Sequence, residues 1–135
     1  MNLATSIRAA LIAMSPVTSL VGGSTSATTR IWSAWPRTYT TPCVVIEVDS
    51  EDESPHLTGQ DSLITASVVL VCRADTDAQA NALQRAVRSG MAAYSGSFSV
   101  IIESTARSNT PKAEGSADHW YDHSIDCTIQ WNEAV

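Results

Sequence analysis

The sequence predicts an α+β fold: a single domain in which a main α-helix packs on one face of a mostly antiparallel β-sheet, with a further helix at the N-terminus. Three observations predict it. One long segment, 76–94, has the apolar spacing of an amphipathic helix. Several segments rich in β-branched residues alternate between apolar and polar with a period of two. Along the chain, these strand-like segments follow one another and are interrupted by that one long helix. A chain of 135 residues, 44% of them hydrophobic, fits one compact unit over 1–135.

The N-terminal helix is predicted over 5–14. Its apolar residues recur at i, i+3, i+4 and i+7, which is one face of a helix, and they are Ile7, Ala10, Leu11 and Met14. Ser15-Pro16 then has the pattern of an N-cap followed by proline at the first helical position. We expect a short second helix here, ended by Gly22-Gly23.

Two strands are predicted in the first half of the chain, after a short extended piece over 30–36. The first, 43–49, has one apolar face. The second, 62–73, is apolar on both faces toward its C-terminal end, as in a central strand that a helix covers. The apolar face of 43–49 consists of Val44, Ile46 and Val48.

The main helix begins with a capping pattern. Thr76 is the predicted N-cap, Gln79 occupies the capping-box position, and Asp77 lies favourably at the positive end of the helix dipole. The helix is expected to run to about Tyr94 and to pack on the sheet. Its apolar stripe is Ala80, Leu83, Val87, Met91 and Tyr94.

Two further strands are predicted at 98–104 and 119–131, the second alternating over its whole length. Two stretches between the strands are polar and contain proline and glycine. We therefore expect long exposed loops at about 50–61 and 105–118.

Composition excludes several classes of function. The formal charge is −6, from eight Lys and Arg against fourteen Asp and Glu, which argues against a surface that grips nucleic acid. No apolar run has the length of a membrane span and the start lacks the basic region of a signal peptide, so we expect a soluble intracellular protein without a membrane partner. Cys43, Cys72 and Cys127 are widely spaced among apolar neighbours and are expected to be buried, reduced thiols.

No catalytic, cofactor or metal signature emerges. The segment His119-x-x-x-His123 with interleaved aspartates would suit a metal on a helix, but on a strand the two histidines lie about 13 Å apart, too far to share an ion. Glycine-rich phosphate loops and nucleophile motifs are absent. We expect no enzyme, cofactor or metal, and keep a small metal-binding enzyme using His119 and His123 as an alternative.

Residues that suit a subunit or partner interface gather in a few places. Trp and Arg are enriched at the buried centres of protein interfaces, and long loops are often functional. The expected interface residues are Trp32, Trp35, Arg37, Tyr39, Lys112 and Trp120. The acidic residues of the first loop, expected to line a channel or an interface, are Glu51, Asp52, Glu53 and Asp61. A solvated loop and core tryptophans are the alternatives.

Taken together, these segments resemble the tail-completion family of long-tailed bacteriophages, also called tail-terminator or tail-to-head joining proteins. The resemblance covers nearly the full length. It rests on the order and spacing of the N-terminal helix, Ser-Pro-Val-Thr-Ser-Leu-Val-Gly-Gly, Arg-Ile-Trp, Thr-Pro-Cys-Val-Val-Ile-Glu-Val, Val-Cys-Arg-Ala, the helix Asp-Thr-Asp-Ala-Gln-Ala-Asn-Ala-Leu-Gln-Arg-Ala-Val-Arg, and the final Ile-Gln-Trp. The acidic loop and the pair Trp32 and Trp35 match no part of it.

The resemblance implies a virion structural protein. Copies of the chain would form a six-fold ring at the junction of tail and neck, assembled in the cytoplasm of the bacterial host. The ring would cap the tail tube protein, end its polymerisation and bind the connector or stopper protein of the neck, and DNA would pass through the hole without sequence-specific binding. A head-side connector or stopper ring is the alternative within the same class.

Overall fold

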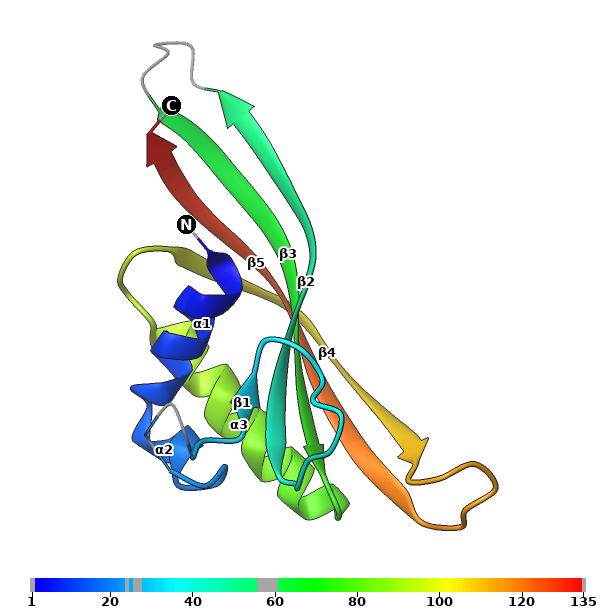
Figure 1. Cartoon of the computed structure of the whole chain (residues 1–135). Helices are drawn as coiled ribbons and strands as arrows, with labels where there is room; N and C mark the ends of the chain where they lie inside the picture. Colours follow the sequence, from blue (N-terminus) through cyan, green and yellow to red (C-terminus); the bar gives the residue numbers. More distant parts are fainter. Residues whose placement is uncertain (1, 24, 26–27, 56–60, 135) are drawn as a thin grey trace.

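The computed structural model describes residues 2–23, 25, 28–55 and 61–134, and the side chains of these residues except 54, 55, 61 and 134. It confirms the predicted α+β class: helices cover one face of a five-stranded sheet (Figure 1). The helices are α1 (Leu3–Ile12), α2 (Ser15–Thr18) and α3 (Asp77–Ala93). The strands are β1 (Ile31–Trp32), β2 (Cys43–Pro55), β3 (Asp61–Ala74), β4 (Ser99–Pro111) and β5 (His119–Ala134).

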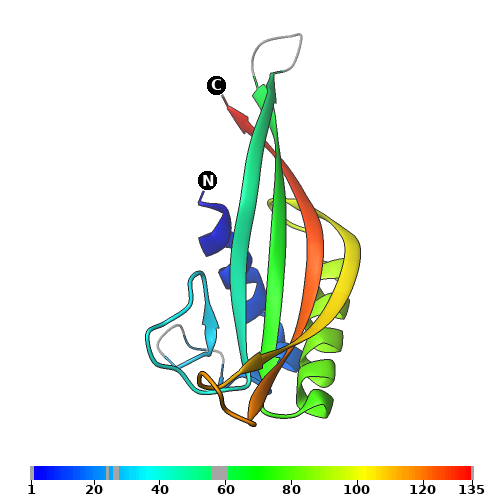
Figure 2. The same cartoon turned by 90° about the vertical axis from the view of Figure 1, so that its right-hand side faces the viewer.

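The sheet has the strand order β1-β2-β3-β5-β4. β1 pairs parallel to β2 over only two residues, and every other neighbouring pair is antiparallel. The four long strands therefore alternate in direction from β2 to β4. Figure 2 views the sheet from the face that the helices do not cover, and the helices lie behind the strands. We call this the helix-free face.

The core lies between the helices and the sheet. β3 and β5 contribute its centre through residues that alternate on the helix-covered face, and these include Ala66, Val68, Leu70, Ile125, Cys127 and Ile129. From the other side come Ile7 and Leu11 of α1 and the predicted α3 stripe, of which Ala80, Leu83, Val87 and Met91 are buried. The apolar side chains that recur every second residue in the strands thus pack against those that recur every three to four residues in the helices.

The main helix begins as predicted, because the Thr76 side chain accepts a hydrogen bond from the backbone N–H of Gln79 at 3.2 Å. Gln84 is buried on the same helix and donates to the backbone carbonyl of Ser124 at 3.0 Å, which fixes α3 against β5. Gly90 gives room to α1 and α2, because a Cβ there would meet the sulfur of Met14.

The N-terminal helices differ from the prediction in their ends. α1 begins at Leu3, because Asn2 caps it by accepting from the N–H of Thr5 at 3.1 Å. Ser15 is the first residue of α2 and not its N-cap; Met14 occupies that position without a side-chain hydrogen bond. Gly22 and Gly23 follow with positive φ, which only glycine adopts readily.

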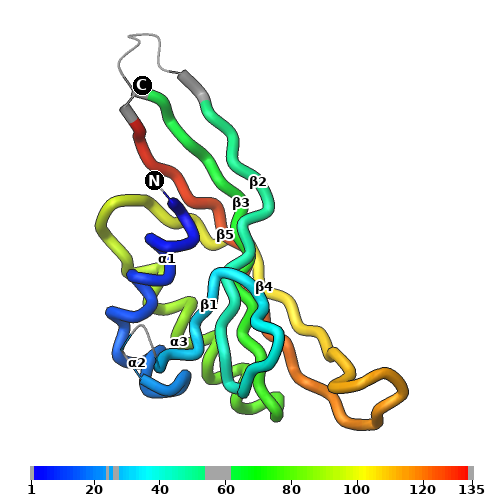
Figure 3. The backbone as a smooth tube through the Cα atoms, viewed as in Figure 1, coloured from blue at the N-terminus to red at the C-terminus, as the bar shows by residue number. Residues whose placement is uncertain are grey.

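The two predicted loops are in part strands, while 112–118 is the turn between β4 and β5. β2 continues to Pro55, and β4 continues to Pro111, so the loop boundaries 50–61 and 105–118 are wrong; residues 56–60 lie outside the described residues. Both segments extend past the helix layer, where neither face is covered and no apolar alternation marks a strand. They are held by backbone pairing with β3 and with β5. Their ends form two arms that project from opposite ends of the sheet (Figure 3).

Each outer long strand carries an irregularity in its register. In β2 it falls between Val48 and Ser50, and in β4 between Ile102 and Ser104. Val48 pairs with Val68, Val68 with Cys127, and Cys127 with Ile102, so both bulges lie on one line across the sheet.

None of the helices in the described part of the chain combines the length and apolar character needed to cross a membrane.

Truncation of Leu70 tests the core. Leu70 is fully buried at the centre of the sheet, so Leu70→Ala should lower the free energy of unfolding by about 2–5 kcal/mol in urea denaturation. Ile101→Ala is the control, because Ile101 is half exposed on the helix-free face. Equal losses for the two variants would contradict the assignment of the core.

Candidate assembly surfaces

A buried arginine organises the lower part of the helix-free face. Arg73, near the end of β3, makes a two-pronged ion pair with Asp122 of β5: Nε to Oδ1 at 2.7 Å and Nη2 to Oδ2 at 2.8 Å. Its Nη1 donates to the Tyr39 hydroxyl at 2.6 Å and its Nη2 to Thr110 of β4 at 3.2 Å. Thr110 in turn donates to Asp122 at 2.8 Å.

Aromatic rings enclose this ion pair. The guanidinium carbon of Arg73 lies 4.1 Å from the ring centroid of Trp35 and 4.7 Å from that of Trp120, within the range of cation–π attraction. The Tyr39 ring lies 5.5 Å from Trp35 and 5.4 Å from Trp120, centroid to centroid. We call the set Arg73, Asp122, Thr110, Tyr39, Trp35 and Trp120 the Arg73 cluster.

The cluster keeps a charge inside the protein without leaving it unpaired. Burial alone would lower the pKa of Arg73, but the hydrogen bonds and charge of Asp122, with Tyr39, raise the pKa above its ordinary value. The Arg73 guanidinium therefore keeps its charge in this buried position. A buried ion pair adds little net stability but fixes geometry, and here it fixes 33–42 over three strands.

Most of the predicted aromatic interface residues are thus brought together within one chain. Trp35 and Trp120 cover Arg73, and Tyr39 touches both. Trp32 meets Tyr39 edge to face at 6.1 Å, and Trp35 also donates to Glu47 at 2.9 Å. Trp32 and Trp120 are partly buried, and Trp35 keeps 36% of its surface exposed.

The two predicted basic interface residues lie at the edges of this region. Arg37 is exposed on the segment that crosses the sheet. Lys112, the first residue of the turn that joins β4 to β5, forms an ion pair with Asp75 at 2.9 Å, and this hydrogen bond, helped by Thr41, lowers the pKa of Asp75. Lys112 therefore anchors the arm to the turn before α3.

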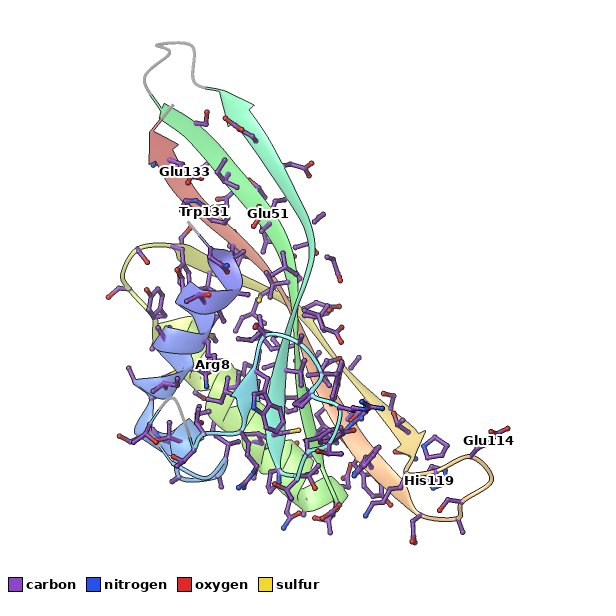
Figure 4. The ribbon with its side chains drawn as sticks, in the orientation of Figure 1. Arg8, Glu51, Glu114, His119, Trp131 and Glu133 are labelled. Carbon is purple, nitrogen blue, oxygen red and sulfur yellow. The ribbon has the colours of Figure 1, made fainter. Side chains whose placement is uncertain are left out.

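The predicted acidic residues lie on the opposite arm. Glu51, Asp52 and Glu53 are exposed on β2 and pair in register with Ala66, Thr65 and Ile64 (Figure 4 labels Glu51). Asp61 begins β3, and its side chain lies outside the described ones. These residues belong to a projecting strand pair and not to the loop that the sequence suggested.

The two histidines are separated as the strand prediction required. His123 is buried, with Nε2 2.8 Å from Asp77 at the start of α3. His119 is the first residue of β5 and lies near the far end of the β4–β5 arm (Figure 4), with its Nδ1 3.0 Å from the backbone carbonyl oxygen of Ala117. Among the side chains that the structure describes, no group of three His, Cys, Asp or Glu residues is placed to hold a metal.

The three cysteines are free and buried, as predicted. Burial raises the pKa of the Cys43 thiol to about 12 and that of Cys127 to about 11, and it raises the pKa of Cys72 as well. These thiols are protonated and inert at neutral pH.

Two surface hollows flank the segment that carries the tryptophans. One, of about 880 Å³, lies between α1 and 32–36 and is lined mostly by apolar atoms around Arg8, Ile12, Trp32 and Trp35. The other, of about 470 Å³, lies beside the Arg73 cluster on the helix-free face and is bordered by Glu47, Val69 and Ser124.

Sequence reasoning missed Arg73 and the role of Asp122. A signal was present: Arg73 falls on the same face as Val69 and Val71 at the end of an apolar strand, where an unpaired charge would be costly. Its partner is 49 residues away, so only the register of β3 against β5 identifies it.

Comparison with known proteins shows the fold. No protein-family model and no curated protein matches the sequence. A solved structure described as the virion of a native gene transfer agent particle contains a chain with a TM-score of 0.54 and 16% identity, covering 95% of this chain and 94% of that one. The present chain therefore shares an overall fold with a chain of that virion.

Removal of Asp122 tests the buried ion pair. Asp122→Ala leaves the Arg73 charge buried without its partner, so the free energy of unfolding should fall by about 3–5 kcal/mol. Asp126→Ala, four residues along the same strand, should cost about 1 kcal/mol or less, because Asp126 is more exposed. Chemical denaturation measures both. The double variant Arg73→Met with Asp122→Leu should recover most of the lost free energy of unfolding. Failure to recover it would contradict the idea that the loss comes from the unpaired Arg73 charge.

Thiol reactivity tests the burial of the cysteines. With pKa values of about 11 and 12, Cys127 and Cys43 should hold roughly a thousandth or less of their population as thiolate at pH 8. Labelling by an aromatic disulfide reagent should be slow in the native protein, speed up as pH rises, and become fast in urea. Rapid labelling of the native protein at pH 8 would contradict this placement.

Proposed function

We propose that this chain is a virion structural protein, a tail terminator whose copies form a ring at the end of a phage-like tail. The observation that carries the proposal is the fold similarity over nearly the whole length of both chains to a chain of a gene transfer agent virion. The order of sequence segments that resembles the tail-completion family supports the same class. The proposed partners are the tail tube protein and the connector or stopper protein of the neck.

The sheet supports assembly into a ring. A ring of identical subunits requires two different, complementary patches on each copy. The sheet offers two outer edges: β4, and the part of β2 beyond β1, which in the described residues pair on one side only. Because the four long strands alternate, rotation about an axis along the strands brings β2 of one copy antiparallel to β4 of the next.

The charge of the helix-free face supports a passage for DNA. Glu47, Asp52 and Asp126 fall on this face, while its strand arginine, Arg73, is neutralised by Asp122. If this face lines the hole of the ring, carboxylates repel the phosphate backbone and DNA slides without being held. This charge favours the proposed passage of DNA without sequence-specific binding.

The experiment is to mix the purified protein with tail tubes assembled from the tube protein of the same source. We expect rings by light scattering and negative-stain microscopy, density at one end of each tube, and tubes that stop growing. Binding to isolated portal or connector rings without any effect on tube growth would favour the head-side connector instead. A protein that neither forms rings nor binds tubes or connectors would contradict both.

A further inference from the structure

A groove runs along the outer edge of β4, on the side where α3 packs. Val100 and Ile102 of β4 and Arg88, Ser89 and Ala92 of α3 line it, and its volume is about 400 Å³. Val100 and Ile102 are only partly buried against the core and leave apolar surface in the groove, while Arg88 and Ser89 make its α3 side polar. Among the described residues the outer edge of β4 has no strand partner, and such an edge can accept an added strand.

The opposite edge of the sheet carries a side chain of matching shape. Val48 of β2 points to the same face as the buried Val44 and Ile46, yet it is 36% exposed. It lies just beyond the two residues of β2 that β1 covers. In the sheet Val48 stands level with Ile102, through the pairs with Val68 and Cys127.

Charge distinguishes the two edges. Beyond Val48, β2 carries Glu51 and Glu53 on the helix-covered face, both exposed. Beside the β4 edge, α3 presents the exposed Arg88, which lines the groove. In an antiparallel pairing with Val48 level with Ile102, Glu51 lies toward the Val100 end of the groove and is opposite in charge to Arg88, whereas two β2 edges would bring like charges together.

We propose that β2 of one copy adds to β4 of a second copy, with Val48 seated in the groove beside Ile102 and Glu51 directed toward Arg88. This junction rests on the proposed ring function, for which it names the contact between copies. The two strands run antiparallel and extend the sheet from one subunit into the next. The bulges in both strands lie at the junction and set the angle between neighbouring sheets.

Site-directed disulfide trapping tests this junction. Val48→Cys protein is mixed with Ile102→Cys protein under mild oxidation, and the dimer is quantified on a non-reducing gel. The control is Ile101→Cys, one residue along β4 and exposed on the other face of the sheet. The native cysteines are buried and do not compete. We expect crosslinking of Val48→Cys to Ile102→Cys to be at least about tenfold faster than to Ile101→Cys, since only one face is aligned.

Equal rates for the two pairs, or no crosslink with either, would overturn the junction. A charge exchange gives an independent measurement: Arg88→Glu and Glu51→Arg should each weaken self-association of the full chain. Mixing the two variants should restore association, because every junction between unlike variants pairs opposite charges. Loss of association without recovery on mixing would also overturn it. If wild-type rings cap tubes but neither the crosslink nor the charge exchange behaves as expected, the junction is wrong and the proposed function stands. If the crosslink forms but the protein does not bind tubes, the junction stands and the proposed function is wrong.

Discussion

The ion pair between Arg73 and Asp122 is the interaction on which the arrangement of the helix-free face depends. It joins β3 to β5, reaches β4 through Thr110, and holds the segment before β2 through Tyr39. The helices stabilise the other face by burying aliphatic side chains. On the helix-free face, the Arg73 guanidinium lies between tryptophan rings and holds the strands and the preceding segment in place. This arrangement requires a specific hydrogen-bond geometry in addition to apolar contact.

The sequence predicted the features that depend on local periodicity. The capping pattern at Thr76 located α3, and the alternation over 119–131 located β5, because each is written into neighbouring residues. The extensions of β2 and β4 were missed, because their polar side chains are solvated on both faces and backbone pairing alone makes them strands. The Arg73 cluster was only half predicted: its tryptophans stood out by composition, whereas their assembly depends on pairing across the sheet.

The candidate surfaces follow from how little of the sheet the helices cover. The core occupies the middle of the four long strands, and the arms extend beyond it at both ends (Figure 3). A domain that buries its centre and leaves its strand edges and arms exposed is suited to contacts with copies of itself and with other components.

The alignment of the two β-bulges has a mechanical consequence. Bulges bend strands and increase their local twist, and here one lies in each outer long strand on the line from Val48 to Ile102. β3 and β5 pair between them without interruption. The bend and added twist are therefore confined to the two outer strands, and each free edge of the sheet changes direction at the same level while the centre stays regular.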